Sequence, residues 1–186
     1  MNYSGIIGSD IANGEGVRVS LFVSGCTHHC KGCFNETTWD FNAGEPFTEK
    51  TEAFLLDALD HPWIDGLSLL GGEPMEPANQ RALVPFLRRF RARFGTAKTI
   101  WCYTGCVLER DLRAPASRWR TEVTDEFLDL LDVLVDGPFV EAQKSLSLKF
   151  RGSANQRILH LKKTAAELTE RFPAPLLAVV CWLLDC

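Results

Sequence analysis

Apolar positions along the chain follow two different periods, which indicates that strands alternate with helices. Short apolar or alternating runs predict strands at residues 17–23, 67–70, 98–103 and 133–135. Apolar residues at helical spacing predict helices over residues 48–59 and 83–94, from Thr124 onward, and over 158–171. Thr48 and Thr124 are the expected N-caps, and Pro85 either lies in a first turn or kinks the second helix.

Strands that alternate with helices form βα units and therefore predict an α/β fold with a largely parallel sheet. The chain has 186 residues, which fits a single domain. In such sheets, ligands bind at the carboxyl ends of the strands. A cysteine-rich loop, the turn Gly71-Gly72-Glu73-Pro74 and the pair Asp136-Gly137 each follow a predicted strand. We therefore expect these motifs at one edge of the sheet.

The loop after the first predicted strand carries Cys26, Cys30 and Cys33 in the spacing CxxxCxxC. Three thiolates at this spacing can hold three irons of a cubane cluster, whereas an ordinary cluster of this kind takes four cysteines. The fourth iron would be open to a small molecule, and an open metal position is typical of a catalytic centre. The alternative is a zinc site with His28 or His29 as the fourth ligand.

Composition narrows the functional classes only slightly. The formal net charge of −4 and the 46% hydrophobic residues are ordinary for a soluble globular protein, and they point neither to nucleic acid nor to a membrane. The first residues lack a basic stretch followed by an apolar one, so we expect no secretory signal. Seven cysteines are an odd number, and three share one loop, which favours a reducing, cytoplasmic setting over a disulfide framework.

Charge is distributed unevenly along the chain. Residues 77–108 contain six bases and no acid, and residues 121–143 contain seven acids and no base. Two solvated helix faces are one interpretation of this pattern, and a docking surface for a protein partner is the other.

The cysteine motif, followed by the aromatic Phe34, resembles the cluster loop of the radical S-adenosylmethionine enzymes. The turn at residues 71–74 resembles the glycine-rich motif after the second strand of that family. The resemblance implies a sheet curved into a partial, open β/α barrel, since a closed eight-unit barrel typically needs about 250 residues. It also implies a 4Fe-4S cluster held by Cys26, Cys30 and Cys33, with S-adenosylmethionine bound at the open iron.

The resemblance implies a set of residues that line the S-adenosylmethionine site, namely Gly32, Cys33, Phe34, Gly71, Gly72 and Glu73. It implies no catalytic residue beyond the cluster cysteines, because homolytic hydrogen transfer needs neither a general acid nor a general base. Phe34 is often tyrosine in this family, so the ring is kept here and the hydroxyl group is missing.

Further segments resemble the branch of the family that activates anaerobic ribonucleoside-triphosphate reductases. They lie at residues 10–18, 21–26, 133–137 and 151–157, and the resemblance covers about residues 1–160. It implies two partners, the large reductase subunit that receives a glycyl radical and a flavodoxin-like electron donor. Arg151, Asn155 and Gln156 either contact the ligand or the partner, or serve as ion-pair and capping residues.

The predicted domain covers residues 1–172, and residues 173–186 form an apolar tail without an assigned role. Cys102 and Cys106 repeat the CxxxC spacing, and we interpret them as buried, inert thiols rather than as an auxiliary metal site. Two alternative functions remain. One is another small radical S-adenosylmethionine enzyme, such as a 7-carboxy-7-deazaguanine synthase or a different glycyl-radical activase. The other is a non-catalytic zinc-binding module.

Overall fold

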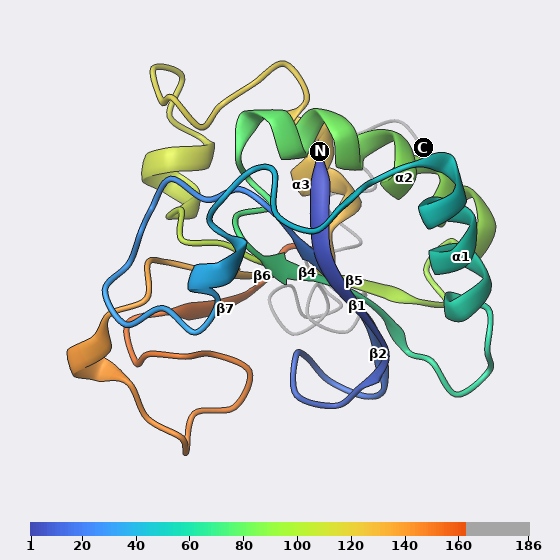
Figure 1. Cartoon of the computed structure of the whole chain (residues 1–186), viewed down its shortest axis with the longest axis horizontal. Helices are drawn as coiled ribbons and strands as arrows, with labels where there is room; N and C mark the ends of the chain where they lie inside the picture. Colours follow the sequence, from blue (N-terminus) through green and yellow to red (C-terminus); the bar gives the residue numbers. More distant parts are fainter. Residues whose placement is uncertain (163–186) are drawn as a thin grey trace, which may run out of the picture.

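The computed structural model of the protein describes residues 1–162. These residues form one seven-stranded sheet with the strand order β3-β1-β2-β4-β5-β6-β7 (Figure 1). The strands are β1 (Asn2–Asp10), β2 (Arg18–Val23), β3 (Glu45–Pro46), β4 (Gly66–Gly71), β5 (Thr99–Tyr103), β6 (Val133–Asp136) and β7 (Arg157–His160). The four strands predicted from the sequence are therefore confirmed as β2, β4, β5 and β6.

The centre of the sheet is parallel and its borders are antiparallel. Strands β2, β4, β5 and β6 pair in parallel, as expected for βα units. Strands β1 and β3 extend the sheet in antiparallel fashion beyond β2, and β7 pairs antiparallel with β6. The sheet is thus mixed rather than largely parallel. It is not closed into a barrel, and the strand pairing by itself does not establish the expected barrel type.

One predicted helix is wrong at its start. Residues 158–160 belong to β7, where Leu159 pairs with Leu134 and Ile158 with Val135. The remainder of the predicted helix, from residue 163 onward, lies outside the described residues. The apolar tail and the domain boundary at residue 172 lie outside them as well.

Three α-helices follow the parallel strands in the described part of the chain, namely α1 (Glu49–Leu59), α2 (Pro77–Phe94) and α3 (Thr124–Leu130). Shorter helical turns span Glu36–Thr38, Leu108–Leu112 and Glu141–Gln143. Thr48 is the N-cap of α1, as predicted, and its backbone N–H donates to Thr51 Oγ1 at 3.3 Å. Helix α2 begins at Pro77, so Pro85 lies in its interior. Thr124 is the first residue of α3 rather than its cap, and its hydroxyl group donates to Gln80 at 2.6 Å.

The two faces of the sheet are built differently, and this difference positions the site. Alternate residues of the central strands pack with the helices into the main core, for example Leu21, Leu69, Cys102 and Leu134. Figure 1 shows α1, α2 and α3 along one side of the sheet, with the segment 137–156 (orange) on the other. On that second side a smaller cluster forms around Trp101, Val133 and Val135.

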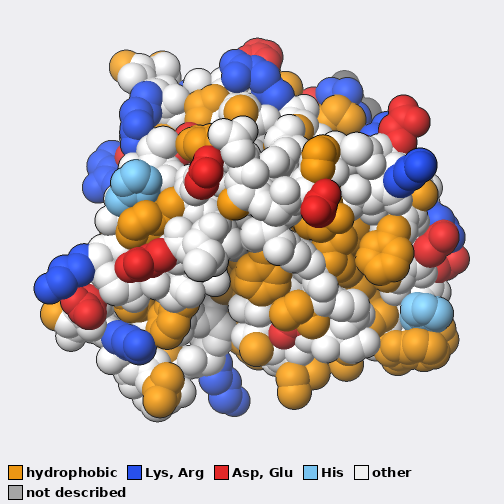
Figure 2. Space-filling view, in the orientation of Figure 1, with side chains coloured by type: hydrophobic (Ala, Val, Ile, Leu, Met, Phe, Trp, Pro, Cys, Tyr) orange, Lys and Arg blue, Asp and Glu red, His pale blue; other side chains and the backbone are white. Residues whose placement is uncertain are grey.

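The two charge-rich segments pair with each other where α2 packs beside the region of α3. From α2, Arg81 binds Glu122, Arg88 binds Glu126 and Arg91 binds Asp132. Arg89 and Arg93 of α2 reach acids of α1 and its C-terminal end. Figure 2 accordingly shows blue and red side chains next to each other along the edges of the molecule. Within residues 1–162, no helix combines the length and the apolar character needed to cross a membrane.

Candidate functional site

A cavity of about 490 Å³ opens at the carboxyl ends of the four parallel strands, on the side of the sheet without helices. Its walls come from the loops after β2, β4, β5 and β6, together with residues of the segment 137–156. The sequence motifs therefore meet at one edge of the sheet, as predicted. Its size lies within the range of small-molecule sites, which is roughly 300–1,000 Å³.

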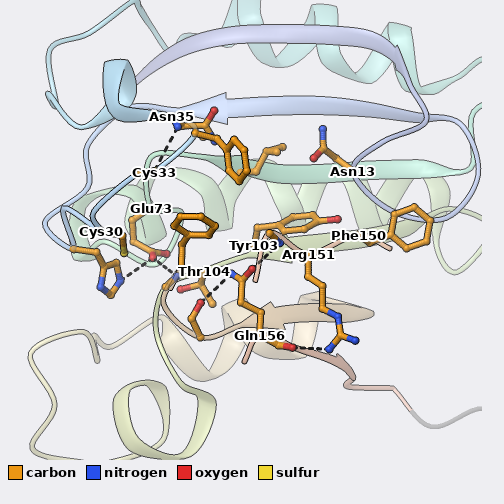
Figure 3. Close-up of a pocket in the computed structure, with 18 of the residues that line it drawn as sticks. Asn13, Cys30, Cys33, Asn35, Glu73, Tyr103, Thr104, Phe150, Arg151 and Gln156 are labelled. Carbon is orange, nitrogen blue, oxygen red and sulfur yellow. Dashed lines mark hydrogen bonds and ion pairs between the residues drawn. The ribbon is translucent and has the colours of Figure 1, made fainter. Parts of the chain in front are cut away.

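The three cysteines of the loop after β2 all line this cavity. Cys26 is buried, with 8% of its surface exposed, and Cys30 and Cys33 are half-buried. Figure 3 shows Cys30 and Cys33 at one end of the cavity and Asn13 and Phe150 toward the other.

The backbone fixes the shape of this loop. The N–H groups of Gly25 and Cys26 donate to the carbonyl groups of Thr38 and Trp39 at 2.8 and 3.1 Å. Gly25 has a φ of +95°, and a Cβ atom there would lie 2.3 Å from the ring of Phe41. A larger residue at this position would therefore displace the start of the loop.

The three thiols are not gathered around a single metal position. Four thiolates around zinc lie about 2.3 Å from the metal, which brings the sulfurs to within about 4 Å of each other. Among the described residues, one group of three ligating atoms lies within 4.8 Å of one another, and it consists of His28, Glu73 and Cys106 rather than the three cysteines. The backbone N–H of Asn35 also donates to Cys33 Sγ at 3.4 Å, a contact of the type that tunes cluster sulfurs.

Burial favours the protonated form of two of these thiols. It raises the pKa of Cys26 to about 12, with a further upward contribution from Glu73, and it also raises the pKa of Cys30. The backbone N–H groups of His28 and His29 act on Cys26 in the opposite direction. Loading of the loop with metal must therefore release protons, because the thiolate is the form that binds.

The glycine-rich turn after β4 packs directly against the cysteine loop. Gly71 has a φ of +104°, and a Cβ atom at Gly72 would lie 2.6 Å from the carbonyl oxygen of Gly25. The backbone N–H groups of Gly72 and Glu73 donate to Val23 and Gly25 at 2.7 and 2.8 Å. The two glycines thus allow one loop to touch the other, and their backbone also lines the cavity.

Glu73 is the only carboxylate on the cavity wall among the described residues, and its oxygens are already engaged. They accept hydrogen bonds from the backbone N–H groups of Met75 and Gly105, each at 2.8 Å, and Oε2 lies 3.0 Å from His28 Nε2. Phe34 is 59% exposed at the mouth of the cavity, where Lys144 lies 4.4 Å from its ring centre. Gly32 is not among the lining residues. Its φ of +71° makes the turn between Cys30 and Cys33, beside Glu141.

Comparison with known proteins matches residues 12–159 to the family described as the 4Fe-4S single cluster domain. A protein of Pasteurella multocida (strain Pm70), named anaerobic ribonucleoside-triphosphate reductase-activating protein, is 44% identical over 160 residues, which are 85% of this chain and 96% of that protein. Proteins of the same name from Escherichia coli (strain K12) and Enterobacteria phage T4 are 42% and 39% identical over 164 and 160 residues. These alignments cover 87% and 85% of this chain and 100% and 93% of the two relatives.

The chain belongs to the family of anaerobic ribonucleoside-triphosphate reductase-activating proteins. The match to a 4Fe-4S domain also removes the support for a zinc-binding module.

Several residues that line the cavity of this protein were not predicted from the sequence. Asn13 comes from the loop before β2, Tyr103 and Thr104 from the end of β5, and Phe150 from the segment after β6. Figure 3 places Tyr103 between the cysteines and Phe150. Its hydroxyl group is buried and has no hydrogen-bond partner in the described part of the chain. The one clue to Tyr103 in the sequence was its place as an aromatic residue at the end of a predicted strand.

The structure distinguishes the roles of Arg151, Asn155 and Gln156. Asn155 Nδ2 and Gln156 Nε2 donate to the carbonyl groups of Pro138 and Gly137, at 2.8 and 3.0 Å, so these amides hold the loop after β6. Arg151 donates to the backbone carbonyl group of Gln156 at 2.9 Å and lines the cavity. Asn155 thus holds the loop, whereas Arg151 and Gln156 also line the cavity.

The second CxxxC pair does not form a separate metal site. Cys102 is fully buried in the main core on the helical side of the sheet, and burial raises its pKa well above that of a free thiol. Cys106 is also fully buried, and its sulfur lies 3.6 Å from His28 Nε2. The five cysteines within residues 1–162 are all free.

Proposed function

We propose that this protein activates an anaerobic ribonucleoside-triphosphate reductase by forming a glycyl radical on its large subunit. The observation that carries the proposal is the convergence of Cys26, Cys30 and Cys33 on one cavity, in a family named for this activation. A three-cysteine 4Fe-4S cluster with bound S-adenosylmethionine would supply the chemistry, since one electron delivered to the sulfonium yields methionine and a radical that takes hydrogen from glycine.

The residues of the chain supply binding, orientation and exclusion of water. Cys26, Cys30 and Cys33 would hold the cluster, and its fourth corner would face the cavity. The backbone at Gly71, Gly72 and Glu73 and the ring of Phe34 surround the space that S-adenosylmethionine would fill, with Gly32 and Cys33 shaping the loop beside it. The sheet and the segment 137–156 form walls of the cavity, which limit the access of solvent to a radical.

The remaining features fit a radical enzyme that works in a reducing compartment. The free thiols within residues 1–162 agree with a cytoplasmic setting. A strongly reducing cluster needs an external electron donor, and we propose a flavodoxin-like protein for this role. The names of the relatives favour activation of the reductase over the 7-carboxy-7-deazaguanine synthase alternative.

Replacement of one cluster cysteine tests the proposal. We expect the anaerobically reconstituted wild-type protein to be brown and to release 5′-deoxyadenosine from S-adenosylmethionine when it is reduced. Cys30→Ala should lose both the cluster and this cleavage, because two thiolates cannot hold three irons. Cys102→Ala is the matched control, since Cys102 lies in the core on the opposite side of the sheet and should keep both properties. Full cleavage by Cys30→Ala would refute the cluster assignment.

A further inference from the structure

The two histidines between the first two cluster cysteines are each stacked on a tryptophan. The ring of His28 lies 4.4 Å from that of Trp119 at an interplanar angle of 16°, and His29 lies 4.6 Å from Trp39 at 24°. His29 also has a φ of 47°, which is uncommon for a residue other than glycine and needs support from its surroundings. The arc of the loop between Cys26 and Cys30 is therefore held by side chains from outside the loop.

His28 makes a second contact, to a carboxylate that joins three loops. Its Nε2 atom lies 3.0 Å from Oε2 of Glu73, which is 1% exposed. The same carboxylate accepts from the backbone N–H groups of Met75 and Gly105, each at 2.8 Å. A single side chain thus connects the cysteine loop with the loops after β4 and β5.

Neighbouring side chains reinforce this arrangement. Both the backbone N–H and the hydroxyl group of Thr27 donate to Glu76 Oε1, at 2.7 Å. Arg118 lies over the ring of Trp119 at 4.2 Å, and its Nη2 atom donates to the Thr27 hydroxyl group at 3.1 Å. The ring of Trp119 therefore contacts both His28 and a cation.

The contacts of Glu73 argue against a metal ion bound by His28, Glu73 and Cys106, although their ligand atoms lie within 4.8 Å of one another. Oε2 of Glu73 already accepts from Gly105 and lies 3.0 Å from His28 Nε2, and Oε1 accepts from Met75. An ion would have to displace hydrogen bonds from a buried carboxylate, and the backbone N–H groups would then lose their partner.

We propose that Glu73, His28 and Trp119 form a positioning unit that sets the shape of the cysteine loop for its cluster, without contacting the iron or S-adenosylmethionine through their side chains. This inference rests on the proposed function, because it assigns the unit to the loop that would hold the cluster. Residues that orient metal ligands from behind typically change metal affinity by about 10- to 100-fold when they are replaced.

Removal of the His28 ring tests the unit through iron release rather than activity. We expect a chelator to remove iron from reconstituted His28→Ala about 10- to 100-fold faster than from the wild type. His28→Phe keeps a ring against Trp119 and should restore part of the retention. His61→Ala is the matched control, because His61 is stacked on Trp63 at 4.4 Å and 11°, outside the lining of the cavity.

Glu73→Gln separates positioning from ligand contact. This variant should lose iron faster than the wild type, by a factor similar to that of His28→Ala, because it removes the carboxylate oxygen that faces His28 and Gly105. Normal iron retention with weakened S-adenosylmethionine binding would overturn the inference. Equal iron release from His28→Ala and His61→Ala would also overturn it.

If His28→Ala does not fold, as judged by circular dichroism of the metal-free protein, His28→Phe and Glu73→Gln decide the question. A wild-type protein that takes up no 4Fe-4S cluster would instead refute the proposed function.

Discussion

A buried arginine at the start of the parallel strands joins the loop before β2 to the sheet. Arg18 begins β2 and is 1% exposed, and its five donor groups are all matched by uncharged oxygens. Nε donates to Ser68 Oγ at 2.7 Å, Nη1 to Thr99 Oγ1 and the carbonyl group of Glu15, and Nη2 to the carbonyl groups of Leu67 and Thr99. Desolvation lowers its pKa to about 10, so it remains a cation at neutral pH. It thereby ties the loop before β2, which carries Asn13, to β4 and β5.

Replacement of this arginine should be costly for stability. Arg18→Met leaves several buried carbonyl and hydroxyl oxygens without a donor, so we expect the free energy of unfolding to fall by about 3 kcal/mol. Urea unfolding of the metal-free protein measures this change. Arg113→Met is the control, because Arg113 is exposed and its replacement should shift stability by no more than about 0.5 kcal/mol. A similarly small loss for Arg18→Met would show that its hydrogen bonds are not needed.

At the level of elements, the sequence revealed the centre of the sheet but not its borders. The strands β2, β4, β5 and β6 are buried parallel strands, which are recognisable as short apolar runs that end at glycine or polar residues. In contrast, β1 contains Gly5 and Gly8 and is half-exposed, so it lacks a clear alternating pattern. Strand β7 depends on pairing with β6, and this long-range contact overrides its local helical composition.

The charged segments also show that contacts between distant parts of the chain could not be predicted from the sequence. Their composition was evident in the sequence, but the finding that α2 and the region of α3 neutralise each other required the packing of the two helices. Most of these pairs are exposed, and exposed ion pairs contribute little to stability. Arg91 is different, because its side chain and that of Asp132 are only 13% and 18% exposed.

Arg91 should therefore be the one arginine of α2 that stability depends on strongly. Besides Asp132, it donates to the carbonyl groups of Leu130, Gly95 and Lys98, so it joins the ends of α2 and α3 to the segment before β5. We expect Arg91→Ala to lower the free energy of unfolding by about 2 kcal/mol.

Thermal and urea unfolding of Arg91→Ala measure this loss. The control Arg93→Ala removes solvent-exposed pairs with Asp57 and Asp60 and a contact with the ring of Phe94, and it should leave the melting temperature almost unchanged. Equal effects of the two variants would contradict the distinction between buried and exposed pairs.

At the scale of the whole molecule, the part of the site that could be predicted is the part encoded in contiguous motifs. The cysteine loop and the turn at residues 71–74 each carry their chemistry within a few residues, and the order of strands brings them to one edge. Asn13, Tyr103 and Phe150 meet in the cavity only because distant segments fold over the same face of the sheet. The role of His28 was equally hidden, since its partners Glu73 and Trp119 are far from it in sequence.

The most direct test of the account is an electron paramagnetic resonance measurement on the reductase itself. The reconstituted protein is mixed anaerobically with S-adenosylmethionine, a reductant and the large subunit of an anaerobic ribonucleoside-triphosphate reductase. We predict an organic radical signal that is split by the remaining α-hydrogen of a glycine, loses this splitting when the subunit is labelled with α-deuterated glycine, and is absent with Cys30→Ala. S-adenosylmethionine cleavage without this signal, or a signal that persists in Cys30→Ala, would contradict the account.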